Sequence, residues 1–234
     1  RIGGGMYLED GSTGVLSSLS FVDNIATREG GALAVTATGE VSCTGCAFDG
    51  NTGDRGGAVD VGADATYIDI GGEYTSNEAT DQDGGAIRVS TDAELEISDA
   101  SFAGNEAAQA GGAIYLYEQG DEVEIVGTAF SVNSASDGDG GAISADKDTD
   151  LLIESCTFDD NTTSLGDGGA VAFDPVTSGH NLTIEGSTFE GNEAGGDGGG
   201  VASEGADNAV FRDAVFLRNR APSGSGGGVF LDAN

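Results

Sequence analysis

The sequence lacks most of what a membrane-spanning or nucleic-acid-binding protein needs. It contains no tryptophan, two prolines and one histidine among its 234 residues. No apolar run reaches the roughly 18 residues that a membrane-spanning helix requires, so none is expected. Eight basic residues stand against 41 acidic ones, and the formal net charge is −33. Because phosphate groups are bound by basic surfaces, this balance excludes nucleic acids and anionic membranes as partners.

Cysteine is also scarce, and the three cysteines are Cys43, Cys46 and Cys156. A small domain held together by disulfides would have an even and larger number. No second cysteine pair or histidine cluster completes a zinc site with Cys43 and Cys46. We expect buried thiols that pack as small apolar side chains. A Cys43–Cys46 disulfide is the alternative.

Glycine, by contrast, is abundant and regularly spaced. The 42 glycines include nine Gly-Gly pairs that are each followed by a small and then an apolar residue, at intervals of 26–30 residues. These tetrads begin at Gly3, Gly30, Gly56, Gly84, Gly111, Gly140, Gly168, Gly198 and Gly226. A glycine pair permits a sharp corner with positive φ and a close approach of stacked backbones. The fixed period therefore indicates a stacked repeat and not a disordered chain.

A second motif, aromatic-x-x-Asn, lies between successive tetrads and occurs eight times. The pairs are Phe21/Asn24, Phe48/Asn51, Tyr74/Asn77, Phe102/Asn105, Phe130/Asn133, Phe158/Asn161, Phe189/Asn192 and Phe216/Asn219. We expect each ring to fill the interior and to stack, offset, on its counterpart in the next repeat. The asparagine is expected at a turn, where it tolerates left-handed backbone and forms a ladder of amides.

Short stretches of strand-like alternation fill the rest of each repeat. One follows the tetrad, as at Leu33 and Val35, another precedes the aromatic, as at Leu95 and Ile97, and a third contains the aromatic. No 3.6-residue apolar period is sustained, so helices are not expected. Equivalent strands of successive repeats would pair in parallel and bury like residues as ladders. The sequence predicts an all-β parallel β-helix, a solenoid of eight to nine coils, with residues 1–234 as one domain.

The two motifs resemble the GGA[ILV] and FxxN repeats of the chlamydial polymorphic outer-membrane proteins. The likeness runs from the tetrad at Gly3 to that at Gly226, which is nearly the whole chain. Those proteins are autotransporter passengers regarded as adhesins. The resemblance implies a right-handed β-helix, display at the cell surface in association with the outer membrane, and self-association.

Catalysis is not expected. Right-handed β-helices also include polysaccharide lyases and hydrolases, whose sites need carboxylates beside basic residues in set contexts. His180 has no such motif around it, and Arg88 and Arg212 have no evident carboxylate partner in the sequence. The coil lengths differ by at most four residues, so the long loops that build catalytic clefts are missing. A carbohydrate-active β-helix, acting as a polysaccharide lyase or hydrolase, is the alternative function.

Calcium is the candidate ligand, and no other cofactor is required. Acidic residues gather in the turns before the glycine pairs, where stacking brings carboxylates of neighbouring coils together. The candidate calcium ligands are Asp81, Asp83, Asp137, Asp139, Asp167 and Asp197. The alternative, which we favour, is a solvated acidic turn without a bound ion. The outward positions after the tetrads form no threonine array, which argues against an ice-binding face: Tyr7, Ala34, Asp60, Arg88, Tyr115, Ser144, Ala172, Ala202 and Phe230.

We therefore expect an extracellular or cell-surface module with a structural or adhesive role. Its partner would be a surface glycan or protein, or copies of itself that stack end to end into filaments. No polar or helical cap is evident at the last coil, and an uncapped coil exposes strand edges. The chain is expected to be either a segment of a longer protein or an uncapped filament subunit.

Overall fold

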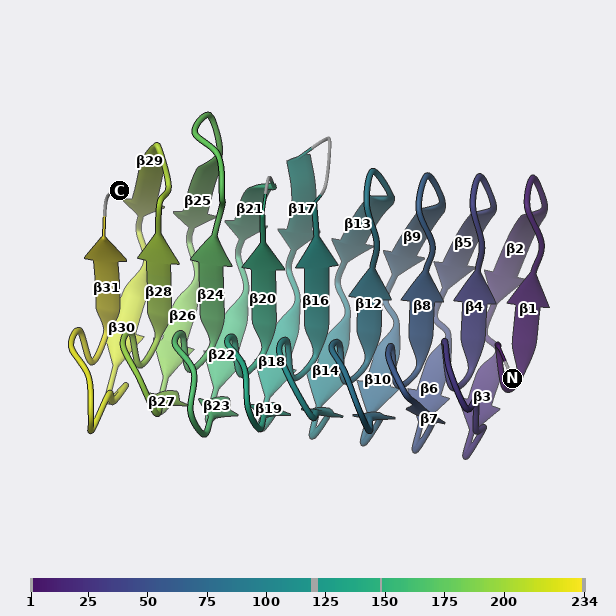
Figure 1. Ribbon diagram of the computed structural model, residues 1–234, viewed down its shortest axis with the longest axis horizontal. Coiled ribbons are helices and arrows are strands. Elements are labelled where there is room, and N and C mark those ends of the chain that lie inside the picture. Colours follow the sequence, from purple (N-terminus) through teal and green to yellow (C-terminus); the bar gives the residue numbers. More distant parts are fainter. Residues whose placement is uncertain (1, 119–121, 148, 233–234) are drawn as a thin grey trace.

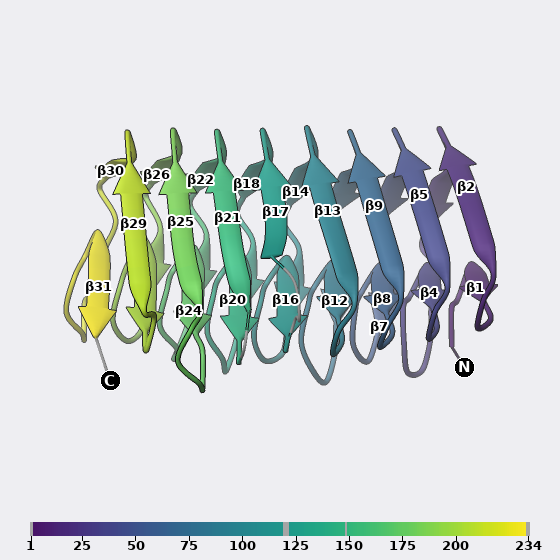
Figure 2. The same cartoon turned by 90° about the horizontal axis from the view of Figure 1, so that it is seen from above.

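The protein is a rod of stacked coils, as a computed structural model shows (Figure 1). The structure describes residues 2–118, 122–147 and 149–232. Within these residues the regular elements are all β-strands, and they pair in parallel. The strands form four sheets, here named A to D, which run along the rod within the described part of the chain. Figure 2 shows the strands of sheet B side by side along the rod.

Each sheet takes one strand from each coil that contributes to it. Sheet A contains β1 (Met6–Leu8), β4 (Leu33–Val35), β8 (Val59–Val61), β12 (Ile87–Val89), β16 (Ile114–Tyr117), β20 (Ile143–Asp146), β24 (Val171–Asp174), β28 (Val201–Glu204) and β31 (Val229–Asp232). Sheet B contains β2 (Thr13–Ser17), β5 (Glu40–Thr44), β9 (Thr66–Ile70), β13 (Glu94–Ser98), β17 (Glu122–Val126), β21 (Asp150–Glu154), β25 (Asn181–Glu185) and β29 (Asn208–Arg212). Sheet C contains β3 (Ser20–Val22), β6 (Ala47–Asp49), β10 (Glu73–Thr75), β14 (Ser101–Ala103), β18 (Ala129–Ser131), β22 (Thr157–Asp159), β26 (Thr188–Glu190) and β30 (Val215–Leu217). Sheet D contains β7 (Thr52–Gly53), β11 (Glu78–Ala79), β15 (Glu106–Ala107), β19 (Ser134–Ala135), β23 (Thr162–Thr163) and β27 (Glu193–Ala194).

Successive coils lie in register, each residue beside its equivalent. In sheet C, Phe102 pairs with Tyr74 on one side and with Phe130 on the other. The register holds because both motifs keep nearly constant distances from the strands, so equivalent residues superpose. The chain winds in a right-handed sense through about eight turns. The predicted right-handed parallel β-helix is confirmed.

Sheet D adds a fourth strand to each coil that contributes to it, and the sequence pattern does not predict this strand. Its strands are two residues long and directly follow the motif asparagine. Each carries one small inward residue, such as Ala79 or Ala107, which is fully buried. Two residues are too few to show an alternation of apolar and polar positions, and this is why the strand leaves no signal in the sequence.

The interior consists of ladders of like residues. The rings of the aromatic motif stack from Phe21 to Phe216, with neighbouring centroids 4.4–5.1 Å apart and ring planes within 3–11° of parallel. Offset parallel stacking is a favourable arrangement for aromatic rings. Aliphatic residues of sheets A and B fill the remainder of the core, as with Ile114 and Ile125, which are fully buried.

The motif asparagines from Asn51 to Asn192 are buried, Asn24 and Asn219 at the two ends are half-buried, and each links one coil to the next. Asn105 donates from Nδ2 to the Tyr74 carbonyl at 3.0 Å and to Oδ1 of Asn133 at 2.9 Å. The same contacts repeat along the rod, so the expected amide ladder is present. The left-handed residue of this turn is not the asparagine but the residue directly before it, for example Gly104, with a φ of 63°.

Cys43 and Cys46 form a disulfide, and this corrects the expectation of free thiols at these two positions. Cys43 lies on β5, and Cys46 lies in the turn before β6. Their Cα atoms are 6.0 Å apart. This separation is within the reach of a disulfide. Both residues are fully buried. Cys156 is a buried free thiol, as expected.

Candidate functional site

A groove lies on the outer face of sheet A, across β16, β20 and β24, and has a volume of about 650 Å³. Its floor is the column of outward residues that the sequence pattern identifies, with Tyr115, Ser144 and Ala172 in register. These floor residues are only 4–6% exposed. The turns that precede the glycine pairs curl over the ends of sheet A at which its strands begin (Figure 1). We call this feature the acidic groove, because carboxylates line both of its walls.

One wall is the column of turns before the glycine pairs. Oδ1 of Asp139 accepts the backbone N–H of Asp167 at 2.7 Å, and Asp167 and Asp197 make the same contact with the coil that follows each of them. Oδ1 of Asp83 accepts the N–H of Ala110 at 3.0 Å. Each of these aspartates therefore ties its turn to the next one, and one carboxylate oxygen is used for this purpose.

The other wall is formed where the strands of sheet A end. Asp146 and Asp174 are in register there, and Glu204 pairs with Asp232 further along the rod. Oδ2 of Asp146 accepts a hydrogen bond from the Tyr115 hydroxyl at 3.0 Å, which joins the floor to this wall. The acidic groove thus holds carboxylates on both sides of a small, polar floor.

The carboxylates of the two walls repel one another. Burial raises the pKa of Asp139, and the charges of Asp167 and Asp146 raise it further, while the N–H of Asp167 opposes this. Burial is also the largest cause of the raised pKa of Asp174, followed by the charges of Asp146 and Asp139. Since each group disfavours the ionisation of the others, the groove attracts positive charge.

An ion-pair network lies beside this groove, nearer the N-terminus. Nη1 of Arg88 lies 3.4 Å from Oδ1 of Asp60, and Nε of Arg55 lies 3.6 Å from the same atom. Arg55 also pairs with Glu29 at 2.6 Å. Burial raises the pKa of Asp60 to about 6, and the two arginines oppose the rise. The expectation that Arg88 lacks a carboxylate partner is wrong, and so is that for Arg212, which lies 3.7 Å from Glu185.

The structure separates the candidate calcium ligands into two sets. Asp83, Asp139, Asp167 and Asp197 form the column of turn aspartates, whereas Asp81 and Asp137 lie exposed at the outer edge of the same wall. Among the described residues, no three carboxylate, histidine or cysteine side chains converge closely enough to hold a metal ion. The recurrence of aspartate before the glycine pair is explained by its backbone contact, and calcium binding stays a prediction.

Sequence reasoning missed the second wall, although a signal for it exists. In the last four tetrads an acidic residue follows the first glycine by six positions, at Asp146, Asp174, Glu204 and Asp232. The signal is hidden because the five earlier coils vary at this position, which holds Glu9, Thr36, Gly62, Ser90 and Tyr117. His180 does not line the groove, and its Nδ1 lies 3.7 Å from Oδ2 of Asp150.

Comparisons with known proteins bear on the fold. A family model described as a right-handed β-helix region matches residues 33–231. Neither the curated proteins nor the solved structures gave a significant match. Across the described residues, no helix is long and apolar enough to cross a membrane.

Proposed function

Because the chain belongs to the right-handed β-helix family, we propose that it is an extracellular or cell-surface module with a structural and adhesive role, whose contact surface is the acidic groove. The observation that carries the proposal is the pair of facing carboxylate walls on an otherwise uniform rod. The likeness of its motifs to those of the polymorphic outer-membrane proteins supports an adhesive role at the cell surface. We expect binding without turnover.

The regularity of the coils supports a structural role. The aromatic stack and the asparagine ladder run through successive coils from Phe21 and Asn24 to Phe216 and Asn219. The repeated residues are therefore occupied in stacking or in corners. A rod built in this way presents its surface groups at fixed spacing, which suits an interaction along an extended partner.

A cationic, extended segment of a surface protein is the partner that the acidic groove fits best. Lysine or arginine side chains would relieve the repulsion between Asp139, Asp146 and Asp174, whereas an anionic glycan would be repelled. The strands from β16 to β24 span roughly 10 Å at the usual strand spacing, which is the length of about three extended residues. Calcium is an alternative counter-ion at the same carboxylates.

The double variant Asp139→Asn with Asp174→Asn tests this contact surface. Asparagine keeps an oxygen that accepts the backbone N–H of Asp167, so the turn is preserved while two charges are removed. At an ionic strength of about 0.1 M, where charges more than about 10 Å away are largely screened, we expect the Kd for a fluorescent oligolysine peptide to rise roughly tenfold, which corresponds to about 1.4 kcal/mol. Fluorescence anisotropy measures the change.

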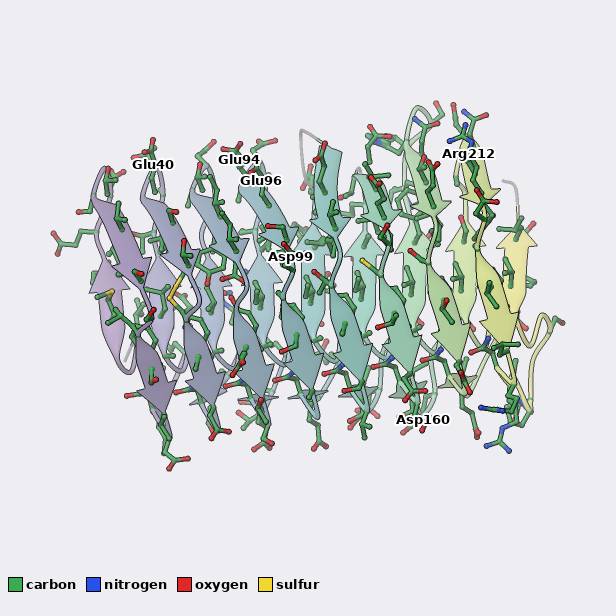
Figure 3. The ribbon with its side chains drawn as sticks, turned by 180° about the vertical axis from the view of Figure 1, so that it is seen from behind. Glu40, Glu94, Glu96, Asp99, Asp160 and Arg212 are labelled. Carbon is green, nitrogen blue, oxygen red and sulfur yellow. A yellow bond between two sulfur atoms is a disulfide. The ribbon has the colours of Figure 1, made fainter. Side chains whose placement is uncertain are left out.

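A second double variant, Asp99→Asn with Asp160→Asn, is the matched control. Both residues are exposed on the opposite side of the rod, where Figure 3 labels them, and their loss changes the net charge equally. It should leave the Kd within about twofold, because exposed distant charges are screened. Equal weakening by the two double variants would refute the groove as the binding surface, since the peptide would then respond to overall charge alone.

The second candidate function is a carbohydrate-active site in the same groove. The observation that favours it is a carboxylate on each wall, Asp139 and Asp174, because glycoside hydrolases act through two carboxyl groups that flank the bond they cleave; burial and neighbouring carboxylates raise the pKa of each. The negative walls would select a neutral or amino-sugar polymer as substrate. Release of shortened chains from such a polymer would support this function.

End-to-end association of copies stays a prediction. Within the described residues, sheet A has nine strands and sheets B and C have eight each. A second copy placed on β31 at regular coil spacing would leave one strand position empty in sheets B and C. Filaments built from this segment alone would therefore need a rearrangement at each junction.

A further inference from the structure

Asp69 occupies an interior position that is not acidic in any other described coil. It lies on β9 in register with Cys43 of β5 and Ile97 of β13, and it is fully buried. The equivalent residues along the rod are Leu16, Cys43, Ile97, Ile125, Ile153, Ile184 and Phe211. A carboxyl group in a column of apolar side chains is costly unless it is protonated or hydrogen-bonded.

The surroundings of Asp69 enclose the carboxyl group but leave both of its oxygens without a hydrogen bond. A Cβ atom on Gly72 would lie 2.2 Å from Oδ2 of Asp69, so the carboxyl fills the space that the glycine leaves. The hydroxyls of Tyr67 and Tyr74 are 2.7 Å apart and hydrogen-bond to each other. The Gly72 N–H and the Tyr74 hydroxyl lower the pKa of Asp69 in part, although neither makes a hydrogen bond of good geometry with its oxygens.

A disulfide lies directly beside this carboxyl group. Asp69 and Gly72 occupy, one coil further along, the positions of Cys43 and Cys46. The bridge closes the turn in one coil, and the carboxyl of Asp69 fills the same turn in the next. Both cysteines are fully buried, so a reductant reaches them only if this part of the rod opens.

No cation faces Asp69 from the elements packed around it. On its own strand the titratable neighbour is Tyr67, and from β10 it is Tyr74. On β5 the neighbour is the disulfide, which does not titrate. The core-facing residues of β13 and of the sheet A strands β8 and β12 are apolar: Leu95, Ile97, Val59, Val61, Ile87 and Val89. Asp60 of β8 is buried on the outer face of sheet A, where it pairs with Arg88.

We propose that Asp69 makes this part of the rod a pH-sensitive opening point: ionisation of its carboxyl loosens the coil and exposes the Cys43–Cys46 disulfide to reductants. Protonated Asp69 is tolerated inside the rod as a small polar group. The ionised form is a buried charge with no counter-ion, and opening the coil to water relieves it.

The direction of the pH effect follows from the burial. Burial raises the pKa of Asp69 from the ordinary 3.8 to about 7, so the folded coil holds the proton more tightly than the unfolded chain does. Its contribution to stability is full below pH 3.8 and is lost as the pH rises through about 7. The coil is thus held most firmly in acid and least firmly above neutral pH.

The rate at which the Cys43–Cys46 disulfide is reduced measures how often this part of the rod opens. The intact chain is incubated with a water-soluble phosphine from about pH 5 to about pH 9, either side of the pKa of about 7, and the new thiols are alkylated and counted by mass spectrometry. Rates are divided by those of the chain unfolded in guanidinium, which removes the intrinsic pH dependence of the reaction. We expect the corrected rate to rise at least about tenfold, since each pKa unit corresponds to a factor of about ten.

Asp69→Asn should abolish this rise and keep the corrected rate at its acid value, because the amide cannot ionise. Asp99→Asn, an exposed aspartate on the turn after β13, should behave as the wild type. A flat wild-type profile, or an unchanged rise in Asp69→Asn, would overturn the proposal. If Asp69→Asn does not fold, hydrogen exchange on the wild type decides: amides of β9 and β10 should lose protection above neutral pH while those of β21 and β22 keep it, and uniform loss would contradict the proposal.

Discussion

Replacing Gly112 by alanine is expected to lower the free energy of unfolding by on the order of 3 to 5 kcal/mol, or to prevent the two adjoining coils from pairing. Gly112 is the second glycine of its tetrad, and a Cβ there would lie 2.1 Å from the carbonyl oxygen of Gly141 and 2.6 Å from the backbone of Ser134. These are backbone atoms of the neighbouring coil, which cannot rotate away as a side chain can. The repeat therefore requires glycine at this position because of the coil spacing.

Gly104→Ala is the matched control for this variant. Gly104 has a φ of 63°, and a Cβ on it would meet nothing nearer than the Ser76 hydroxyl at 3.9 Å. It should cost only about 1 kcal/mol, which is the strain of a left-handed alanine. Chemical denaturation followed by circular dichroism measures both variants. If Gly112→Ala costs no more than Gly104→Ala, the close backbone contact between coils is not as described.

The second large effect is expected for Asn105→Ala, at about 3 to 6 kcal/mol of unfolding free energy, because three buried groups would each lose a partner worth about 1 to 2 kcal/mol. The backbone N–H and the Nδ2 of Asn77 lose their acceptor, and the Tyr74 carbonyl loses its donor. None of these groups is exposed to water, so no solvent molecule replaces the missing contact.

Asn208→Ala serves as the comparison, because Asn208 is exposed and its Nδ2 donates only to Asn181 at 2.8 Å among the contacts that the structure describes. Its cost should stay below about 0.5 kcal/mol. Guanidinium titrations of the two variants give the difference directly. A loss below about 1 kcal/mol for Asn105→Ala would mean that the amide ladder contributes little to holding the coils together.

The fold could be predicted from the sequence because the residues that determine it recur. Gly112 and Asn105 each belong to a column whose chemistry is the same in every coil, so the period exposes them. Features confined to one coil leave no such trace. The disulfide of Cys43 and Cys46 and the carboxyl of Asp69 both replace residues that are apolar or small elsewhere, and the period alone suggests only that these positions are interior.

The candidate site could be predicted only in part. The turn aspartates such as Asp139 were visible as a cluster, but their bond to the backbone of the next coil depends on how tightly the turns stack. The floor was visible as the outward column that includes Tyr115 and Ser144. The groove arises because the turns fold over that column. No local sequence pattern predicts how far a turn extends over a sheet.

The most direct test of a binding surface without turnover is to incubate the protein with an amino-sugar polymer and to follow the chain lengths of the polymer by mass spectrometry. Such a polymer is cationic, so it should enter the acidic groove and lie between Asp139 and Asp174, where a catalytic pair of carboxylates would act on it. We expect the polymer to be retained by the protein with its length distribution unchanged. Shortened chains that disappear in the Asp139→Asn, Asp174→Asn variant would contradict this account and identify the groove as an active site.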